Sequence, residues 1–276
     1  MSTDRKELSR RLEEHGLGRV ARQLVALAQP RLRLRKANGT QQPRSSHLGG
    51  TPDLPRATAW PQWNDRSLAF LAQIRLEDLP AAPELGLPRR GLLAFFYDQE
   101  QSTWGFAPAD RGSCQVIHSP DAAACEPRDF PADVDTSCRY APVPVEPVAE
   151  LSLPSTQSEV IEPLALTEDE SDALVDLAES GHWLAGYPAP VQNDTMELEC
   201  AITAAGVYCG DGKAYEDARL PEWKRQAKEW QLLLQLDSDD DANWMWGDMG
   251  CLYFWVRKAD LTRADFRRVW LVLQCG

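Results

Sequence analysis

Short runs of apolar residues recur along the chain, and each has the length of a β-strand rather than of a helix. Buried strands are therefore predicted at residues 68–74, 91–97, 232–236, 251–256 and 269–274.

The first part of the chain has the spacing of an amphipathic helix. Leu8, Leu12 and Leu24 recur at helical intervals within residues 4–28. Proline has no amide hydrogen to donate, so the helix is expected to end before Pro30.

Other helices are expected in the second half. Thr167 and Glu170 have the spacing of a capping box, which predicts a helix that Gly181 ends. Residues 196–205 are expected to be helical too, although their first part also alternates like a strand. A further helix is predicted at residues 221–230, and residues 262–265 are expected to cap a short helix between the last two strands.

Two segments look irregular. Residues 31–66 are rich in proline, glycine and arginine, and residues 119–165 carry prolines throughout. Because proline removes a ladder donor, no central strand is expected in the second of these segments. It is interpreted as the connection between two halves of the molecule.

Three motifs occur twice in the same order, which indicates an internal repeat. They read x-L-[GA]-G-x-P, apolar-L-x-Q-apolar and G-x-L-x-F-aromatic. The paired segments are 47–52 with 183–188, 70–74 with 232–236, and 91–96 with 250–255.

The predicted fold is α+β and internally duplicated. Two pseudo-symmetric halves, each containing a sheet, are expected to form one compact unit with helices outside. Residues 1–30 would form the amphipathic helix, and residues 31–276 one domain. The two repeats would span about 44–118 and 180–276, joined by the proline-rich connection at about 119–165.

The charge of the chain limits its partners. A formal net charge of −13 argues against nucleic acid, since phosphate binding needs clustered Lys and Arg. Ten Lys and Arg nevertheless lie within residues 5–36, while residues 150–200 and 237–248 are acidic. The basic start is either a solvated helix face or a means of steering a partner.

The cysteines and the hydropathy indicate a compartment. Seven cysteines without a C-x-x-C spacing fit neither a disulfide framework nor a zinc ribbon, so reduced, mostly buried thiols in the cytoplasm are expected. The first thirty residues do not read as a signal peptide. No window approaches 18 apolar residues, so no membrane span is expected.

The repeated motifs also carry a family resemblance. L-L-L-Q-L-D-S-D-D at residues 232–240 and M-W-G-D-x-G-x-L-Y-F-W-V at 245–256 resemble the YwqG-like family, a bacterial group of unknown function. The similarity extends from about Leu48 to Gln274. It implies a duplicated α+β fold and no established activity. The family's association with toxin genes suggests an immunity or other protein-binding role.

Five aspartates follow the third apolar run, and four of them have a calcium-loop spacing. Ala242 stands where an EF-hand loop needs glycine, and the preceding segment reads as a strand, so an EF-hand is rejected. The segment is either a solvated hairpin loop, a docking surface for a basic partner, or at most a weak divalent site. The five are Asp237, Asp239, Asp240, Asp241 and Asp248, and all but Asp240 have the metal-ligand spacing.

Two glutamines and two tryptophans complete the candidate binding residues. Gln73 and Gln235 lie inside apolar strands, and a buried amide must find partners. Each either bonds the protein's own backbone or an indole, or contacts a ligand in a central groove. Trp244 and Trp246 lie beside the aspartates and are expected to be partly exposed, as in a recognition surface.

Catalytic motifs are weak. No H-E-x-x-H or G-x-S-x-G occurs, and the glycine pairs lack the rest of a phosphate loop, so neither a cofactor nor a catalytic residue is assigned. A pair of Cys209 with His47 or His182 stays open. The leading hypothesis is a non-catalytic protein of immunity or toxin-neutralising type, with a basic toxin domain as partner. The alternative is a small-molecule or metal-dependent enzyme with a site between the two repeats.

Overall fold

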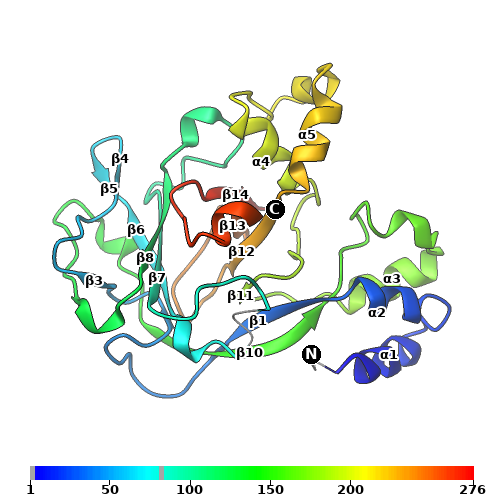
Figure 1. The fold of residues 1–276 in the computed structure, drawn as a ribbon, viewed down its shortest axis with the longest axis horizontal. Helices are drawn as coiled ribbons and strands as arrows, with labels where there is room; N and C mark the ends of the chain where they lie inside the picture. Colours follow the sequence, from blue (N-terminus) through cyan, green and yellow to red (C-terminus); the bar gives the residue numbers. More distant parts are fainter. Residues whose placement is uncertain (1–3, 81–83) are drawn as a thin grey trace.

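One antiparallel sheet of ten strands organises the computed structural model, which describes residues 4–80 and 84–276. The strand order is β14-β13-β12-β11-β1-β10-β2-β6-β7-β8. The sheet curves so strongly that its two end strands approach each other (Figure 1). The thiol of Cys114 on β8, for example, lies 3.8 Å from the carbonyl of Val269 beside β14. The predicted α+β class is confirmed, although the strands form one sheet and not two.

Four strands on each side of the centre form the two wings of this sheet. The first wing consists of β2 (His47–Leu48), β6 (Ala69–Arg75), β7 (Leu92–Tyr97) and β8 (Cys114–Ser119). The second wing consists of β11 (Trp183–Leu184), β12 (Trp230–Asp237), β13 (Cys251–Arg257) and β14 (Trp270–Gln274). All five strands that the apolar runs predict are therefore confirmed. Two small ribbons pair β3 (Asp53–Pro55) with β9 (Cys125–Pro127), and β4 (Gln62–Trp63) with β5 (Arg66–Ser67).

The two central strands lie in segments that were expected to be irregular. Strand β1 (Gln29–Lys36) pairs with β10 (Val143–Ser152) along its whole length. Strand β1 also pairs with β11 of the second wing, and β10 with β2 of the first. The prediction that residues 119–165 contain no central strand is wrong, and so is the irregular assignment of the start of residues 31–66.

The prolines of β10 are tolerated because they lie where the ladder needs no amide. The amide of Val145 donates to Ser46 on the β2 side, and Pro147, two residues on, faces the same side. Strand β2 is only two residues long and has ended there. Pro147 therefore removes no ladder hydrogen bond. The amide of its cross-strand partner Leu34 also points away from it and donates to the carbonyl of His182, just before β11.

The N-terminal amphipathic segment is two helices, α1 (Arg5–Glu14) and α2 (Ala21–Leu27), and not one. Gly16 has φ 83°, a left-handed conformation that ends a helix, so the chain turns there. Asp4 caps α1 by accepting a hydrogen bond from the amide of Lys6 at 2.8 Å. Residues 1–3 of the predicted 1–30 segment lie outside the described residues.

The later helices largely follow the prediction. Helix α3 (Glu168–Asp176) begins with the predicted capping box of Thr167 and Glu170. Residues 196–205 form a helix and not a strand. A short helix does lie between the last two strands, but it ends before Thr262, so residues 262–265 do not cap its start as predicted. These elements are α4 (Met196–Ala204), α5 (Leu220–Ala227) and α6 (Lys258–Leu261).

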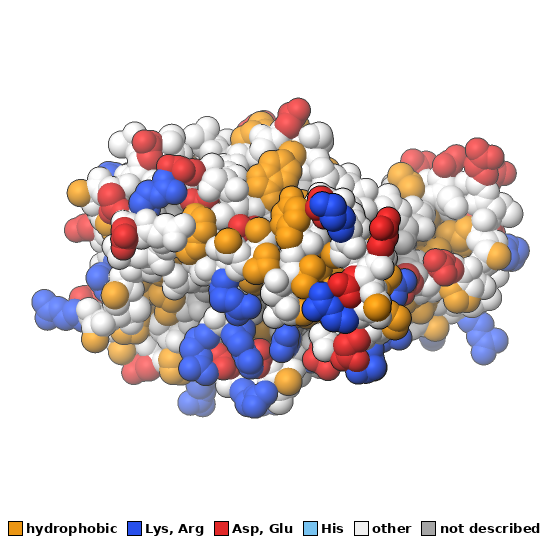
Figure 2. Space-filling model, turned by 90° about the horizontal axis from the view of Figure 1, so that it is seen from above, with side chains coloured by type: hydrophobic (Ala, Val, Ile, Leu, Met, Phe, Trp, Pro, Cys, Tyr) orange, Lys and Arg blue, Asp and Glu red, His pale blue; other side chains and the backbone are white. Residues whose placement is uncertain are grey.

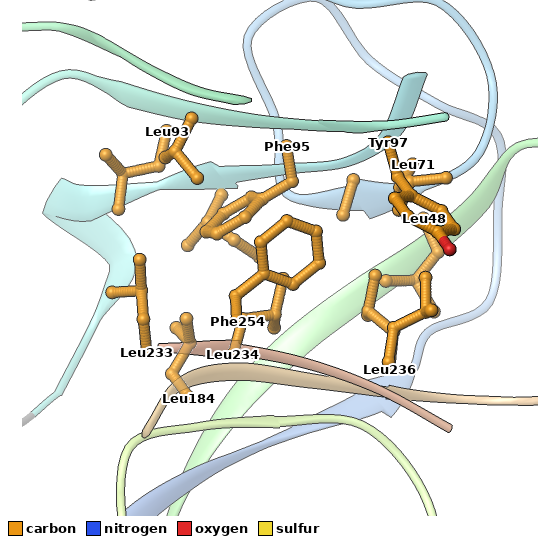
Figure 3. Packing of buried hydrophobic residues seen from close by; sticks show 14 of the residues in the cluster. Leu48, Leu71, Leu93, Phe95, Tyr97, Leu184, Leu233, Leu234, Leu236 and Phe254 are labelled. Carbon is orange, nitrogen blue, oxygen red and sulfur yellow. The ribbon is translucent and has the colours of Figure 1, made fainter. Parts of the chain in front are cut away.

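The curved sheet separates two main apolar clusters. Its concave face encloses the larger cluster, where strands of both wings meet around Phe95 and Phe254 (Figure 3). On the outside of the second wing, α4 and α5 cover a second cluster that contains Trp183 and Tyr253. Helices α1, α2 and α3 form a lobe at one end of the molecule, with its own smaller cluster (Figure 1). No helix in the described ranges is both long and apolar enough to cross a bilayer.

The two wings have the same local irregularities. Strand β6 is bulged between Phe70 and Ala72, and β12 is bulged between Leu232 and Leu234, at the matching motif positions. A bulge re-aims the strand and increases its twist, so both wings bend at the same place.

Candidate functional site

The acidic loop, residues 238–250, connects β12 to β13 and is held in a defined shape. Asp239 and Trp244 exchange two backbone hydrogen bonds, of 3.0 and 2.8 Å. The side chain of Gln101, from the first wing, donates to the carbonyl of Met245 at 3.0 Å and accepts from the amide of Gly247 at 3.1 Å. The loop is therefore attached to the body of the molecule from both wings.

Trp244 and Trp246 are buried, so the prediction that they are partly exposed is wrong. Their exposed fractions are 1% and 0%, and both rings meet Tyr140 edge-to-face at 5.8 Å within the concave core. The indole of Trp246 donates to the carbonyl of Asp237 at 3.1 Å. Burying these two large rings attaches the loop firmly to the core, because large aromatic rings dominate core energetics.

The apolar side chains that this loop exposes are two methionines. Residues 242–247 alternate between buried and exposed, so the arrangement that buries Trp244 and Trp246 turns Met245 outward. Met245 is 46% exposed and Met249 67% exposed. The exposed aspartates of the same loop are Asp240, Asp241 and Asp248. The loop therefore presents apolar and acidic groups together.

The first two aspartates of the segment have structural partners. The carboxylate of Asp237 accepts from the amide of Gly181 at 2.9 Å. Asp239 accepts from Nε2 of His182 at 2.9 Å and from Lys36 at 2.9 Å. Burial alone raises the pKa of Asp239, but the hydrogen bonds from His182 and Lys36 outweigh it and lower the pKa below its usual range. Asp239 is therefore a charged anchor of the loop.

These contacts leave little for a cation. Oδ1 of Asp239 already accepts from the amides of Asp241 and Ala242, at 2.9 and 3.1 Å. Asp240 and Asp248 point to solvent from different parts of the loop. Within residues 4–80 and 84–276, no three or more His, Cys, Asp or Glu side chains are grouped to hold a metal ion.

Gln73 holds two separate pieces of backbone in the first wing. Its Oε1 accepts from the amide of Asp53 at 2.8 Å, and its Nε2 donates to the carbonyl of Ser45 at 3.0 Å. Nε2 also donates to the carboxylate of Asp53 at 2.9 Å. The side chain is fully buried, and all three bonds are made within the chain.

Gln235 makes the equivalent pair of bonds in the second wing. Its Oε1 accepts from the amide of Ala189 at 2.9 Å, and its Nε2 donates to the carbonyl of Gly181 at 3.1 Å. In both wings the glutamine Oε1 accepts from the amide of the residue that follows the proline of x-L-[GA]-G-x-P. The glutamine Nε2 donates to the carbonyl of the residue two places before the motif. These glutamines therefore fix the turn, and neither directs its amide into a cavity.

The candidate nucleophile is not activated. The thiol of Cys209 lies 3.6 Å from the carbonyl of Phe106, and burial raises its pKa to about 12. His47 contacts Gly49 and Gln41, and His182 contacts the aspartates described above. The open pairing of Cys209 with a histidine is therefore not formed. All seven cysteines are unpaired and buried, as the sequence predicts.

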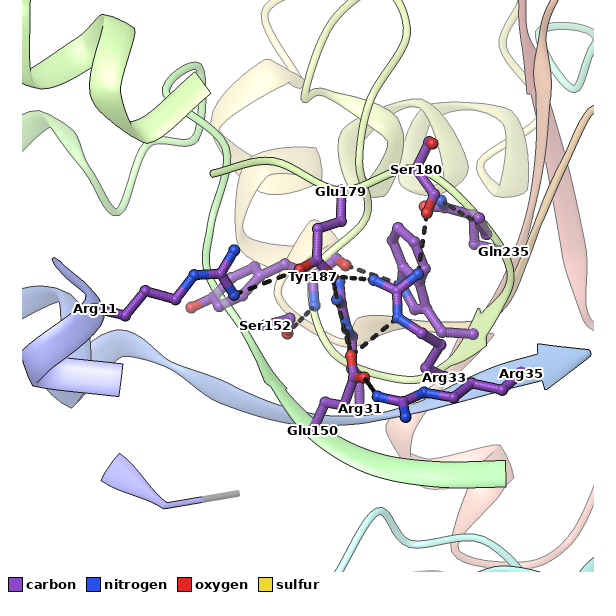
Figure 4. Close-up of polar contacts among 12 residues, drawn as sticks. Arg11, Arg31, Arg33, Arg35, Glu150, Ser152, Glu179, Ser180, Tyr187 and Gln235 are labelled. Carbon is purple, nitrogen blue, oxygen red and sulfur yellow. Dashed lines mark hydrogen bonds and ion pairs between the residues drawn. The ribbon is translucent and has the colours of Figure 1, made fainter. Parts of the chain in front are cut away.

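An arginine cluster on β1 was missed because residues 31–35 were expected to be irregular. Alternating positions place Arg31, Arg33 and Arg35 on one face of the strand. Arg31 contacts Glu150 on β10 at 3.1 Å and Glu179 at 2.6 Å, and Arg33 contacts the same two carboxylates (Figure 4). The R-x-R-x-R spacing, with period two, is the signal that predicts such a strand.

The architecture defines an α+β protein with a nearly closed antiparallel sheet and no activated nucleophile among the side chains described above. The chain belongs to the family described as a domain of unknown function, DUF1963, whose model matches residues 46–275. No curated protein matches the chain.

Proposed function

We propose that this protein is a non-catalytic binding protein and that its acidic loop docks a basic protein partner. The observation that carries the proposal is the exposure of Met245 and Met249 among three exposed aspartates. Methionine is flexible and polarizable, and it is common on surfaces that bind other proteins. The flanking carboxylates favour a partner with Lys and Arg around an apolar contact.

The loop is preorganised for docking. The buried rings of Trp244 and Trp246, the two bonds of Gln101 and the Asp239–His182 contact all fix its backbone before a partner arrives. A binding surface that is already ordered loses less conformational entropy on association than a mobile one.

The charge of the whole protein supports the same class of partner. The net charge of −13 favours the approach of a basic protein at low ionic strength. On the face shown in Figure 2, acidic and basic side chains are interspersed, with apolar side chains gathered between them. A local acidic surface is therefore needed for specificity, and the loop supplies one.

The alternative of an enzyme with its site between the two repeats has less support. The space between the wings on the concave side is filled by a packed apolar cluster in which Phe95 meets Phe254. The glutamines that would have served as ligands bond backbone. A metal-dependent variant of this alternative lacks grouped ligands in the part of the chain that the structure describes.

Internal duplication is part of the proposal, and the central ladder supports it. Strand β1 pairs with β11 of the second wing as β10 pairs with β2 of the first wing. Matching these two pairings makes Arg33 on β1 and Pro144 on β10 equivalent positions. The same alignment makes Leu34 equivalent to Val145, and Lys36 equivalent to Pro147. The pair of Leu34 and Pro147 therefore corresponds to the pair of Val145 and Lys36 in the same β1–β10 ladder. This behaviour is expected of a two-fold axis that passes near the pair of Arg35 and Glu146.

Two finer assignments rest on the family resemblance and the composition. The YwqG-like motifs suggest an immunity or toxin-neutralising role, which makes a basic toxin domain the expected partner. Free, buried cysteines fit a cytoplasmic protein.

A cross-linking experiment in producing cells tests the docking surface. A photoreactive phenylalanine analogue replaces Met249, and a control protein carries it at Tyr208, which is 50% exposed outside the loop. We expect a protein of basic isoelectric point to be captured at position 249 and not at 208. The purified captured protein is then titrated against the wild-type chain in rising salt.

The titration uses two charge-matched variants. In the first, Asp240, Asp241 and Asp248 become asparagine, and we expect the Kd to rise about tenfold at low salt, since rim charges act mainly through steering. In the second, three exposed acids of α3 (Glu168, Asp169 and Asp172) lose their charge in the same way, and the Kd should change little. Equal capture at both cross-linker positions, or an equal effect of the two variants, would overturn the proposal.

A further inference from the structure

A cavity of about 240 Å³ lies between α3, the loop after β10 and the turn after β11. Its walls include Arg31, Trp183, Tyr187 and Leu174, with Glu179 at its polar side. At roughly 30 Å³ for each water molecule, the space suits a small molecule and not a peptide. None of the residues of the acidic loop lines it.

The polar side of this cavity belongs to the arginine cluster (Figure 4). Its guanidinium groups come from Arg11, Arg31, Arg33 and Arg35, and its carboxylates from Glu150 and Glu179. The described residues of the cluster thus contain two more cations than anions. Burial, followed by repulsion from Arg33, lowers the pKa of Arg31, so an additional anion would stabilise its charge.

Arg31 has a donor to spare at this place. The side chain is only 4% exposed. Its Nε and Nη2 atoms donate to Glu150, and Nη2 donates also to Glu179. Nη1 makes no hydrogen bond with any described residue. A guanidinium prefers to satisfy its donors with a planar oxyanion, so a donor without a described partner, on a nearly buried side chain that lines a cavity, points to a ligand carboxylate.

Beside the polar residues 155–157, the rest of the wall is largely apolar. The face of Trp183 stacks on Arg31, with 4.5 Å between the guanidinium carbon and the ring centroid. The indole of Trp183 donates to the carbonyl of Tyr187 at 3.2 Å, and the hydroxyl of Tyr187 donates to the carbonyl of Leu27 at 3.1 Å. Both rings have therefore satisfied their polar groups internally and offer only apolar surface to a ligand.

We propose that this cavity binds a small monocarboxylate with an aromatic or branched apolar body. The carboxylate would accept from Nη1 of Arg31, and the body would lie against Trp183, Tyr187 and Leu174. Glu179 disfavours a ligand with a second negative charge. The site is separate from the acidic loop, so the two proposals succeed or fail independently.

The probe is 4-fluorobenzoate, observed by fluorine NMR during titration of the full chain. It has about ten non-hydrogen atoms, a fragment-sized ligand for a cavity of this volume. We expect saturable binding, and 4-fluorobenzyl alcohol, which is neutral and similar in shape, should bind at least tenfold more weakly. Inorganic phosphate at the same concentration should not displace the acid.

Two variants locate the binding. Arg31→Lys keeps a positive charge but removes the planar guanidinium, and it should weaken 4-fluorobenzoate at least tenfold. Since this change also disturbs a buried network, Ala178→Phe is the second variant, because exposed Ala178 lines the cavity outside that network. It should abolish binding while the melting temperature stays near that of the wild type. Equal affinity for acid and alcohol, or binding that survives Ala178→Phe, would show that the cavity is not a carboxylate site.

Discussion

Phe95 on β7 meets Phe254 on β13 edge-to-face in the concave core, with ring centroids 5.3 Å apart and planes at 78° (Figure 3). The two residues occupy the same position of the repeated motif G-x-L-x-F-aromatic. Under the proposed duplication, side chains at equivalent positions touch each other only close to the axis that would relate the two halves. This contact therefore marks where the wings depend on each other.

A double-mutant cycle on this pair measures that dependence. Both rings are fully buried, so Phe95→Ala and Phe254→Ala should each lower the free energy of unfolding by about 3–5 kcal/mol. The double variant should lose less than the sum, with a coupling of about 1 kcal/mol, because the edge-to-face contact is counted in both single variants. Denaturant unfolding supplies the values. Strict additivity would show that the two rings stabilise their wings independently.

The matching glutamines allow a second test of the turn that both wings share. Gln235→Leu leaves the amide of Ala189 and the carbonyl of Gly181 without partners, and an orphaned buried group costs about 1–3 kcal/mol. We therefore expect a loss of about 2–4 kcal/mol and a clear fall in melting temperature. Gln73→Leu should have an effect of the same size, because its bonds are equivalent.

Binding is the control for that experiment. If Gln235 contacted a ligand, Gln235→Leu would leave the melting temperature nearly unchanged and abolish partner binding. The bonds described above predict the opposite: a less stable protein that still binds its partner at a temperature where it is folded.

The sequence predicts the wings well and the centre of the sheet poorly, for a physical reason. Apolar runs of strand length mark strands that are buried on both faces, such as β7 and β13. Strand β1 buries leucines on one face and ion-paired arginines on the other, so its composition resembles that of an exposed loop. Strand β10 carries prolines whose missing amides fall where no neighbour needs them, and only the pairing register reveals this.

The acidic loop shows a similar limit. Its aspartates indicate a solvated segment, and from composition alone its tryptophans read as exposed. What decides their position is the contact with Tyr140, which is distant in sequence and contributes to the concave core. Alternation along residues 242–247 then exposes Met245, a consequence that depends on knowing which side of the segment is buried.

Glu199 gives the protein a predicted dependence of stability on pH. It lies on α4 and is 3% exposed. Its Oε1 accepts from the hydroxyl of Thr195 at 3.0 Å, and its Oε2 has no partner among the described residues. Burial raises the pKa of Glu199 to about 7, a shift that the bond from Thr195 only partly opposes.

Because the folded-state pKa lies above the value in the unfolded chain, the folded protein binds the proton more tightly. The stabilisation is complete below the pKa of the unfolded chain, about 4.5, and is lost as the pH rises through 7. This shift corresponds to about 3 kcal/mol, at 1.36 kcal/mol for each pKa unit. Glu199→Gln stays neutral at every pH, so its free energy of unfolding relative to wild type should increase by about 2–3 kcal/mol between pH 4.5 and pH 8. Urea unfolding of both proteins across this range gives the difference, and a difference that does not change with pH would mean that Glu199 is charged in the folded protein.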